Sequence, residues 1–154
     1  MDIEKHENLQ LDKVDFSSFE TFDKKLRVLY KNDAAEAAKD ASDYLYLSNT
    51  LNDLILAISI KISKCETIVN SEYSKALIES KGELKKIGAD TTEALKKAWA
   101  ENKIEYSEAK REKNNWGAVL LFLKGKLNIY IKAHQFCHNL FYQDSGLAKF
   151  GNRE

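Results

Sequence analysis

The chain has 154 residues, no proline, 31% charged residues and a formal net charge of zero, so its overall charge indicates no class of partner. Its length fits one domain, and the absence of proline permits very long helices. The charge is unevenly spread. Residues 1–60 carry twelve acidic and seven basic side chains, whereas residues 61–154 carry twelve acidic and seventeen basic ones. A basic C-terminal part is compatible with polyanion binding, although such charge more often belongs to a solvated helix face.

The N-terminal part of the chain predicts a flexible arm followed by a short helix. Residues 1–16 are polar, with a few apolar side chains among charges, and are expected to order only against a partner. Residues 17–20 read Ser-Ser-Phe-Glu, which is a capping box. Apolar side chains then follow at helical spacing, at Phe19, Phe22, Leu26 and Leu29. A helix over about 17–31 is expected.

A long helix is predicted over about 34–81, after an interruption at Asn32 and Asp33. Its apolar side chains follow alternating steps of four and three, at Leu51, Ile55, Ile58, Ile62, Cys65 and Val69. This period favours supercoiling against another helix. Two glycines, Gly82 and Gly88, then bracket a basic turn over 82–90.

A second long helix is predicted over about 91–143, because residues 90–93 read Asp-Thr-Thr-Glu, a capping signature. It keeps one four-three register through Leu95, Trp99, Asn102, Tyr106, Ala109, Lys113, Trp116, Leu120, Leu123, Leu127, Tyr130, His134, Cys137 and Phe141. The short connection makes the two long helices antiparallel neighbours. The sequence therefore predicts an all-α fold, a long coiled-coil-like hairpin with a short N-terminal helix, in a single domain over 17–146 with a tail over 147–154.

One end of this hairpin is expected to be an apolar base that assembles with other copies. Between residues 116 and 142 the second helix is hydrophobic beyond a single stripe, and the segment opposite, about 30–56, is too. Large exposed apolar patches mark association surfaces. The predicted interface residues are Trp116, Gly117, Leu120, Phe122, Leu123, Gly125, Leu127 and Tyr130.

Two glycines interrupt the apolar pattern of the second helix. Each costs roughly 1 kcal/mol against alanine within a helix. Gly117 and Gly125 lie eight residues apart on nearly one face, which favours close approach of another helix over a pair of simple weak points.

The stretch from Trp116 to Lys132 resembles the C-terminal helix of the UvsY family of phage recombination mediators. The likeness consists of Trp-Gly followed by leucine, phenylalanine, glycine and leucine at Leu120, Phe122, Gly125 and Leu127. The helical layout from about residue 34 onward fits the same family. The resemblance implies a ring-like homo-oligomer that binds single-stranded DNA, often DNA carrying a single-strand-binding protein, and helps a RecA-like recombinase form its filament. ATP use would belong to the recombinase, so neither enzymatic activity nor a cofactor is expected of this chain.

The basic end of the hairpin is the predicted DNA contact. The residues are Lys75, Lys81, Lys85, Lys86, Lys96 and Lys97, with Tyr73 added for stacking. Members of the resembled family bind DNA through a basic, aromatic-containing stretch at the end of their first long helix. Here Glu79 and Ser80 stand in place of that stretch's paired aromatic residues, and four glutamates dilute the cluster.

Catalytic and metal sites are not predicted. The chain has no phosphate-binding glycine loop, nucleophile elbow or carboxylate pair in apolar surroundings. His134 and His138 are spaced to share a helix face, but Cys137 points about 100° away from His138 and no further ligand cluster accompanies them. These side chains are interpreted as packing or interface residues.

No targeting or membrane signal is visible, so a soluble cytoplasmic protein is expected, in the host cell if it is phage-encoded. The N-terminus is acidic, and the longest apolar run, residues 118–123, is too short to span a bilayer. The two cysteines, Cys65 and Cys137, predict core thiols and no disulfide framework. A different functional class explains the ladder and apolar base equally well, namely a structural or inhibitory helical module that binds another protein and no nucleic acid.

Overall fold

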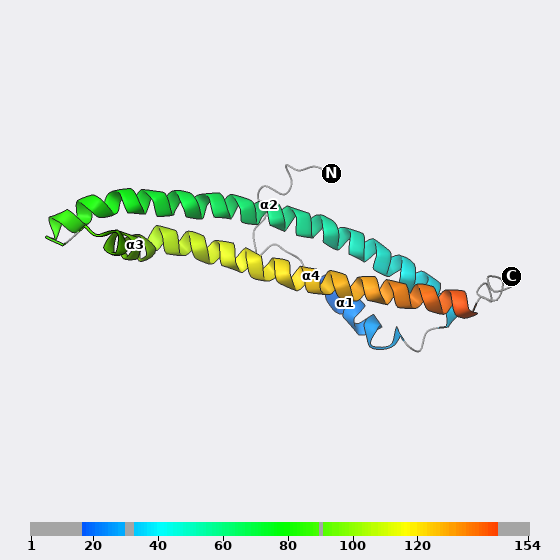
Figure 1. The fold of residues 1–154 in the computed structure, drawn as a ribbon. Coiled ribbons are helices and arrows are strands. Elements are labelled where there is room, and N and C mark those ends of the chain that lie inside the picture. Colours follow the sequence, from blue (N-terminus) through cyan, green and yellow to red (C-terminus); the bar gives the residue numbers. More distant parts are fainter. Residues whose placement is uncertain (1–16, 30–32, 90, 145–154) are drawn as a thin grey trace, which may run out of the picture. The chain divides into compact units, whose positions relative to one another are not determined.

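The computed structural model of the chain describes residues 17–29, 33–89 and 91–144, and every regular element within these ranges is a helix. The elements are α1 (Ser17–Leu26), α2 (Ala34–Lys86), α3 (Glu93–Glu101) and α4 (Ile104–Asp144), with α2 and α4 antiparallel (Figure 1). This arrangement confirms the predicted all-α hairpin with its short N-terminal helix. None of the described helices is long and apolar enough to cross a membrane. The predicted arm over 1–16 and tail over 147–154 lie outside the described residues.

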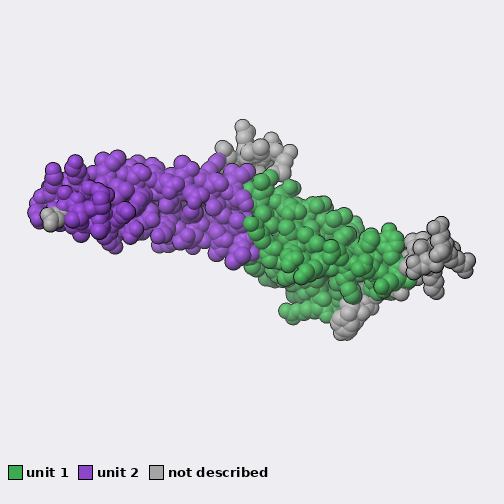
Figure 2. Space-filling model, in the orientation of Figure 1, with its two compact units in different colours: residues 1–56, 122–154 green, residues 57–121 purple. Residues whose placement is uncertain are grey.

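The chain divides into two compact units, drawn in different colours in Figure 2. Unit 1 comprises residues 1–56 and 122–154, and unit 2 comprises residues 57–121. Helices α2 and α4 each contribute a segment to both units, α1 belongs to unit 1, and α3 belongs to unit 2. Each unit is therefore built around its own antiparallel pair of segments. The single domain over 17–146 stays a prediction.

The most deeply buried positions of the long helices recur every seven residues. In α2 the side chains at this spacing that are at most 2% exposed are Tyr44, Leu51, Ile58 and Cys65, and in α4 those at most 1% exposed are Trp116, Leu123, Tyr130 and Cys137. The alternate ladder positions between them are half-buried, at Ile55, Ile62, Leu120, Leu127, His134 and Phe141. A seven-residue repeat of this kind is the pattern of paired supercoiled helices. Two predicted ladder positions are exposed, Leu95 and Asn102, and both precede α4.

Within unit 1, helix α1 packs against α2 and α4 through aromatic rings. Phe22 lies 5.8 Å from Tyr44 and 6.3 Å from Tyr130 between ring centroids, and Phe19 lies 6.3 Å from Tyr130. Tyr44 and Tyr130 also contact each other, at 5.8 Å, which joins α2 to α4 beneath α1. The aromatic spacing predicted for α1 is thus its packing face.

Polar contacts surround this aromatic cluster. The Tyr130 hydroxyl donates to Asp23 Oδ1 at 3.1 Å, and Lys126 pairs with the same carboxylate. On the other side of α1, Lys25 lies 3.1 Å from Asp40 and 3.0 Å from Asp43. Because a buried hydroxyl without a partner costs free energy, the Asp23 contact allows Tyr130 to be buried.

Helix α2 runs five residues past its predicted end and finishes in a Schellman motif. The Gly88 N–H donates to the Lys85 carbonyl at 3.1 Å, the Ala89 N–H donates to the Leu84 carbonyl at 2.9 Å, and Gly88 has φ +67°. Gly82 lies within α2, so the turn is shorter than the predicted 82–90, and the last basic residues of that range are helical. Gly82 has no neighbouring atom within 4 Å of an added Cβ. The boundary prediction failed because an isolated glycine is tolerated inside a well-supported helix.

The prediction of one continuous helix over 91–143 is wrong, because the helix is interrupted at Asn102 and Lys103. The N-cap of α3 is Thr92, which lies within the predicted capping signature; its hydroxyl accepts the Leu95 N–H at 3.3 Å, and the helix begins at Glu93, two residues later than predicted. At the other end the Asn102 side-chain amide donates to the Ala98 carbonyl at 2.8 Å. The Asn102 backbone N–H also donates to this carbonyl, at 3.2 Å, so the side-chain bond is added to the last helical bond of α3. Apolar periodicity alone does not reveal an end to the helix here.

Candidate nucleic-acid interface

The predicted DNA-contact lysines lie on the end of α2 and on α3, all in unit 2. Three of them form i,i+3 ion pairs, Lys75 with Glu72 at 2.6 Å, Lys86 with Glu83 at 2.7 Å and Lys96 with Glu93 at 2.6 Å. The hydrogen-bonded carboxylates raise the pKa of Lys75 and Lys86, and the lysines lower the pKa of Glu83 and Glu93. Local glutamates therefore neutralise half of the predicted cluster.

Lys81, Lys85 and Lys97 are exposed and form no ion pair with the described residues. Lys81 and Lys85 are four residues apart on α2 and so present their ammonium groups on one helix face. Like charges at this spacing repel each other, and an approaching anion relieves that repulsion. These three lysines are the part of the predicted cluster that is best suited to meet a phosphate backbone.

The aromatic side chains near this cluster are occupied by contacts within unit 2. The Tyr73 ring is half-buried and packs on Tyr106, with centroids 5.3 Å apart. Lys103 Nζ lies 4.1 Å from the centroid of the Trp99 ring and also pairs with Glu79 at 3.1 Å. Base stacking on Tyr73 would have to use the ring face that Tyr106 leaves open.

The predicted interface residues divide by burial. Trp116, Leu123 and Tyr130 are at most 1% exposed in the chain's own core, so they have no side-chain surface for a second copy. Phe122 is 48% exposed and Gly125 is exposed, whereas Gly117, Leu120 and Leu127 are half-buried. Seven-residue periodicity predicts which stripe is buried, but it does not separate the chain's own partner helix from another subunit.

The two α4 glycines do not serve a close helix contact within the described part of the chain. An added Cβ at Gly117 or Gly125 would meet no atom within 4 Å. The expected close approach is therefore absent among the described residues, and close approach of another subunit stays a prediction. The period places a glycine on a face without saying what covers that face.

Large apolar side chains are exposed in both units, and those of unit 1 include residues beyond the set predicted for the base. The large apolar side chains of unit 1 that are at least 39% exposed are Val28, Leu45, Tyr46, Leu56, Phe122, Ile129, Ile131, Phe136 and Tyr142. Tyr46 is 75% exposed, which is far more than an aromatic core residue shows. These side chains form the exposed apolar set of unit 1.

His134 and Cys137 pack within unit 1, whereas His138 is exposed and its ring contacts those of His134 and Tyr142. Cys137 is buried, and burial raises the pKa of its thiol to about 11. His134 Nδ1 lies 2.8 Å from the Ala41 carbonyl, which makes Nδ1 the protonated donor, and its ring centroid lies 5.9 Å from that of His138. Among the described residues no group of three potential metal ligands occurs.

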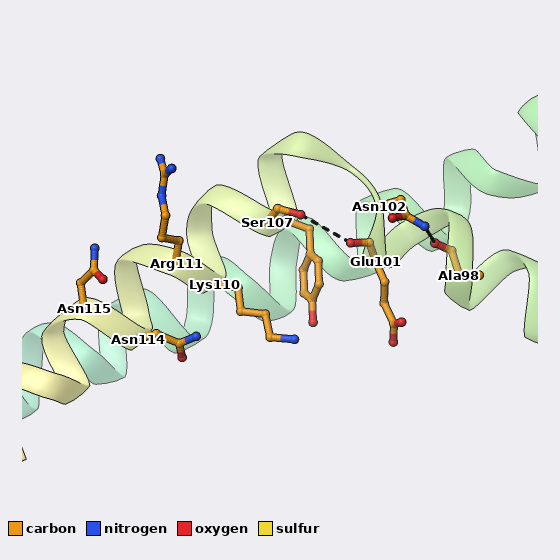
Figure 3. A pocket seen from close by; sticks show the side chains of 9 residues that line it. Ala98, Glu101, Asn102, Ser107, Lys110, Arg111, Asn114 and Asn115 are labelled. Carbon is orange, nitrogen blue, oxygen red and sulfur yellow. Dashed lines mark hydrogen bonds between the residues drawn. The ribbon is translucent and has the colours of Figure 1, made fainter.

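A groove at the junction of α3 and α4 was missed by the sequence reasoning. Its volume is about 740 Å³, and it is lined by Ala98, Glu101, Asn102, Tyr106, Ser107, Lys110, Arg111, Asn114 and Asn115. Figure 3 shows Arg111 and Asn115 pointing to one side of α4 and Lys110 to the other. The signal was present in the sequence as polar residues at helical spacing, but it also fits an ordinary solvated face. We call this site the α3–α4 groove.

Comparisons of the chain with protein family models, with curated proteins and with solved structures found no match.

Proposed function

We propose that this protein is a recombination mediator that binds single-stranded DNA and helps a RecA-like recombinase replace a single-strand-binding protein. The observation that carries the proposal is the resemblance of Trp116–Lys132 to the UvsY family. The exposed lysines at the end of α2 and on α3 support it, because Lys81, Lys85 and Lys97 form no ion pair within 4 Å with the described residues, although Lys97 acts at longer range on Glu93. Such side chains bind a phosphate backbone without sequence preference.

The proposal includes a homo-oligomer, ring-like as in the resembled family. The exposed apolar set of unit 1 supports association, because large apolar side chains that are exposed in one copy can be buried against another. Several copies would present several lysine clusters to one strand. Weak individual contacts then hold through multivalency, which suits a protein that must also release the strand to the recombinase.

The test is a salt titration of binding to a single-stranded oligonucleotide. Replacing Lys81, Lys85 and Lys97 together by alanine should lower affinity at low salt and flatten the slope of log affinity against log salt by about 2, roughly 0.7 for each lost phosphate contact. The matched control replaces Lys39, Lys124 and Lys132, which are exposed lysines of unit 1 without ion pairs among the described residues. Both variants lose the same charge, so the control separates a local contact from a general loss of positive charge.

Absence of binding by the parent protein at low salt would defeat the mediator proposal. A second readout is the ATP hydrolysis of a RecA-like recombinase on DNA coated with single-strand-binding protein, which the parent should accelerate. Equal binding by the parent and the variant that lacks Lys81, Lys85 and Lys97, at every salt concentration, would show that the DNA contact lies elsewhere.

A protein-binding module without a nucleic-acid role is the second candidate. It is favoured by the ion pairs of Lys75, Lys86 and Lys96, which reduce the net charge of the predicted cluster. The exposed apolar set of unit 1 would then be the surface for a different protein. The oligonucleotide titration separates the two candidates, because only the mediator binds DNA with a steep salt dependence.

A further inference from the structure

The α3–α4 groove has the composition of an anion site. Along α4, Ser107, Lys110, Arg111, Asn114 and Asn115 follow one another at steps of three, one, three and one, which places them on one broad face of the helix. All five are exposed, and together they offer hydroxyl, ammonium, guanidinium and amide donors. No carboxylate of α4 lines the groove.

The two cationic side chains of the groove form no ion pair with the described residues, whereas neighbouring lysines do. Lys103 pairs with Glu79, and Lys113 pairs with Glu66 at 2.6 Å, so these two lysines are held by α2. Arg111 forms no ion pair with the described residues, and Lys110 has only the Tyr106 ring, whose centroid lies 5.5 Å from its Nζ. Because arginine presents a planar fork of donors, Arg111 is well suited to a phosphate.

The groove is large enough to hold a ligand. Binding sites for small molecules commonly enclose about 300–1,000 Å³. The volume of about 740 Å³ falls within this range. In Figure 3, Lys110 extends to one side of α4 and Arg111 to the other, so a strand crossing this face would meet a cation on either side.

One acidic side chain opposes this chemistry. Glu101 lines the groove and points to the same side as Lys110 in Figure 3. A neighbouring hollow is lined by Glu105, Glu108 and Glu112 of α4 and by Glu72 of α2, and Arg111 and Asn115 border both hollows. The acidic hollow therefore adjoins the groove at Arg111, while Glu101 is the acidic residue that lines the groove itself and serves the experiment below.

We infer that the α3–α4 groove is a second contact for the sugar–phosphate backbone of single-stranded DNA. The contact rests on the proposed mediator function and adds a surface that neither the lysine cluster nor the resemblance assigns. Lys110 and Arg111 pair with phosphates, and Asn114 and Ser107 donate hydrogen bonds between them. A strand bound here is read by its backbone and not by its bases, so binding is independent of sequence.

Charge substitutions test the groove in both directions. Replacing Lys110 and Arg111 by alanine should weaken binding of an oligo-dT strand roughly tenfold at low salt and flatten the salt slope by about 1.4. Glu101→Gln removes the opposing charge and should tighten binding several-fold. The control replaces Lys124 and Lys132, exposed lysines of unit 1, and should change affinity far less.

A thiol placed in the groove reports occupancy directly. The native cysteines are buried, and burial raises the pKa of both thiols, so they react slowly with a maleimide. Asn114→Cys introduces an exposed thiol in the groove, and Asn128→Cys introduces a matched one elsewhere on α4. Oligo-dT should slow alkylation of the first several-fold and leave the second unchanged.

The outcomes separate this inference from the function on which it rests. If the parent binds no DNA, the mediator proposal and the groove contact both fail. If the parent binds DNA but the alanine pair matches it and the Asn114→Cys thiol is unprotected, the groove contact alone is wrong. Protection by poly-glutamate equal to that by oligo-dT would also overturn it, since the groove would then take an acidic peptide as readily as a nucleic acid.

Discussion

Gly88 and Gly82 are chemically identical residues with opposite roles at the end of α2. Gly88 adopts φ +67°, in the left-handed region that costs other residues roughly 1 kcal/mol or more. Gly82 is helical and has open space around it, so a methyl group there removes a helix defect.

Substitution by alanine should therefore change stability in opposite directions at these two positions. Gly88→Ala should lower the free energy of unfolding by about 1 kcal/mol, and Gly82→Ala should raise it by about 0.5–1 kcal/mol. Urea unfolding followed by circular dichroism measures both, with helix content checked beforehand. A gain in stability for Gly88→Ala would contradict the Schellman assignment.

The individual lysines of the predicted cluster also differ although the sequence treats them alike. Each of Lys75, Lys86 and Lys96 has a glutamate three residues before it, and the structure pairs them with it. That spacing was readable from the chain, but Lys97 lies four residues after Glu93, an equally favourable spacing, and only the structure shows that Glu93 pairs with Lys96. Whether Lys110 had a carboxylate partner could not be read in this way, because partners on α2 are remote in sequence.

At the scale of elements, the junction between α1, α2 and α4 depends on two buried phenols. Tyr44 and Tyr130 are both 0% exposed, and desolvation raises the pKa of each hydroxyl, aided at Tyr130 by its hydrogen bond to Asp23. The folded state therefore binds these hydroxyl protons more tightly than the unfolded chain, in which the pKa of tyrosine is about 10. The contribution of these groups to stability is complete below that pH and is lost as the pH rises above it.

Alkaline conditions should consequently destabilise the packing of α1, α2 and α4 at this junction. The free energy of unfolding should fall above pH about 10, by up to about 1.4 kcal/mol per pH unit for each phenol, and Tyr130→Phe should make the decline shallower. Tyr46→Phe is the control, because that side chain is 75% exposed. Urea midpoints measured between pH about 8 and about 11 test this, and an identical pH dependence for parent and Tyr130→Phe would show that the phenol does not govern it.

At the scale of the whole molecule, the structure distinguishes apolar residues that are buried in the chain's own core from apolar residues that are exposed. Leu123 is fully buried, so Leu123→Asp should unfold the protein and cannot test assembly. Tyr46 and Phe136 are 75% and 45% exposed in unit 1 and are free to change without opening the core.

Tyr46→Asp combined with Phe136→Asp should give a folded protein of smaller oligomeric size, because two charges are placed in the exposed apolar set of unit 1. Sedimentation at micromolar concentrations measures the change. The control is Asn70→Asp combined with Ser71→Asp, which adds the same charge at exposed polar positions of α2 in unit 2. Gly125→Leu should also weaken assembly if a second copy approaches α4 closely. A parent protein that stays monomeric across this range would rule out the proposed homo-oligomer.

The sequence alone determined the helices, their period and their antiparallel pairing, because hydrophobic spacing, capping residues and a short connection are local properties of the chain. Seven-residue spacing from Leu51 to Cys65 and from Trp116 to Cys137 identified the buried stripes, whereas Tyr44, which the structure buries completely, was not part of the predicted ladder. Only the tertiary structure decided which cations are paired with carboxylates, that an added Cβ at Gly125 would meet open space, and that the helix is interrupted at Asn102. Those outcomes depend on side chains brought together from distant positions and on local backbone geometry, neither of which periodicity records.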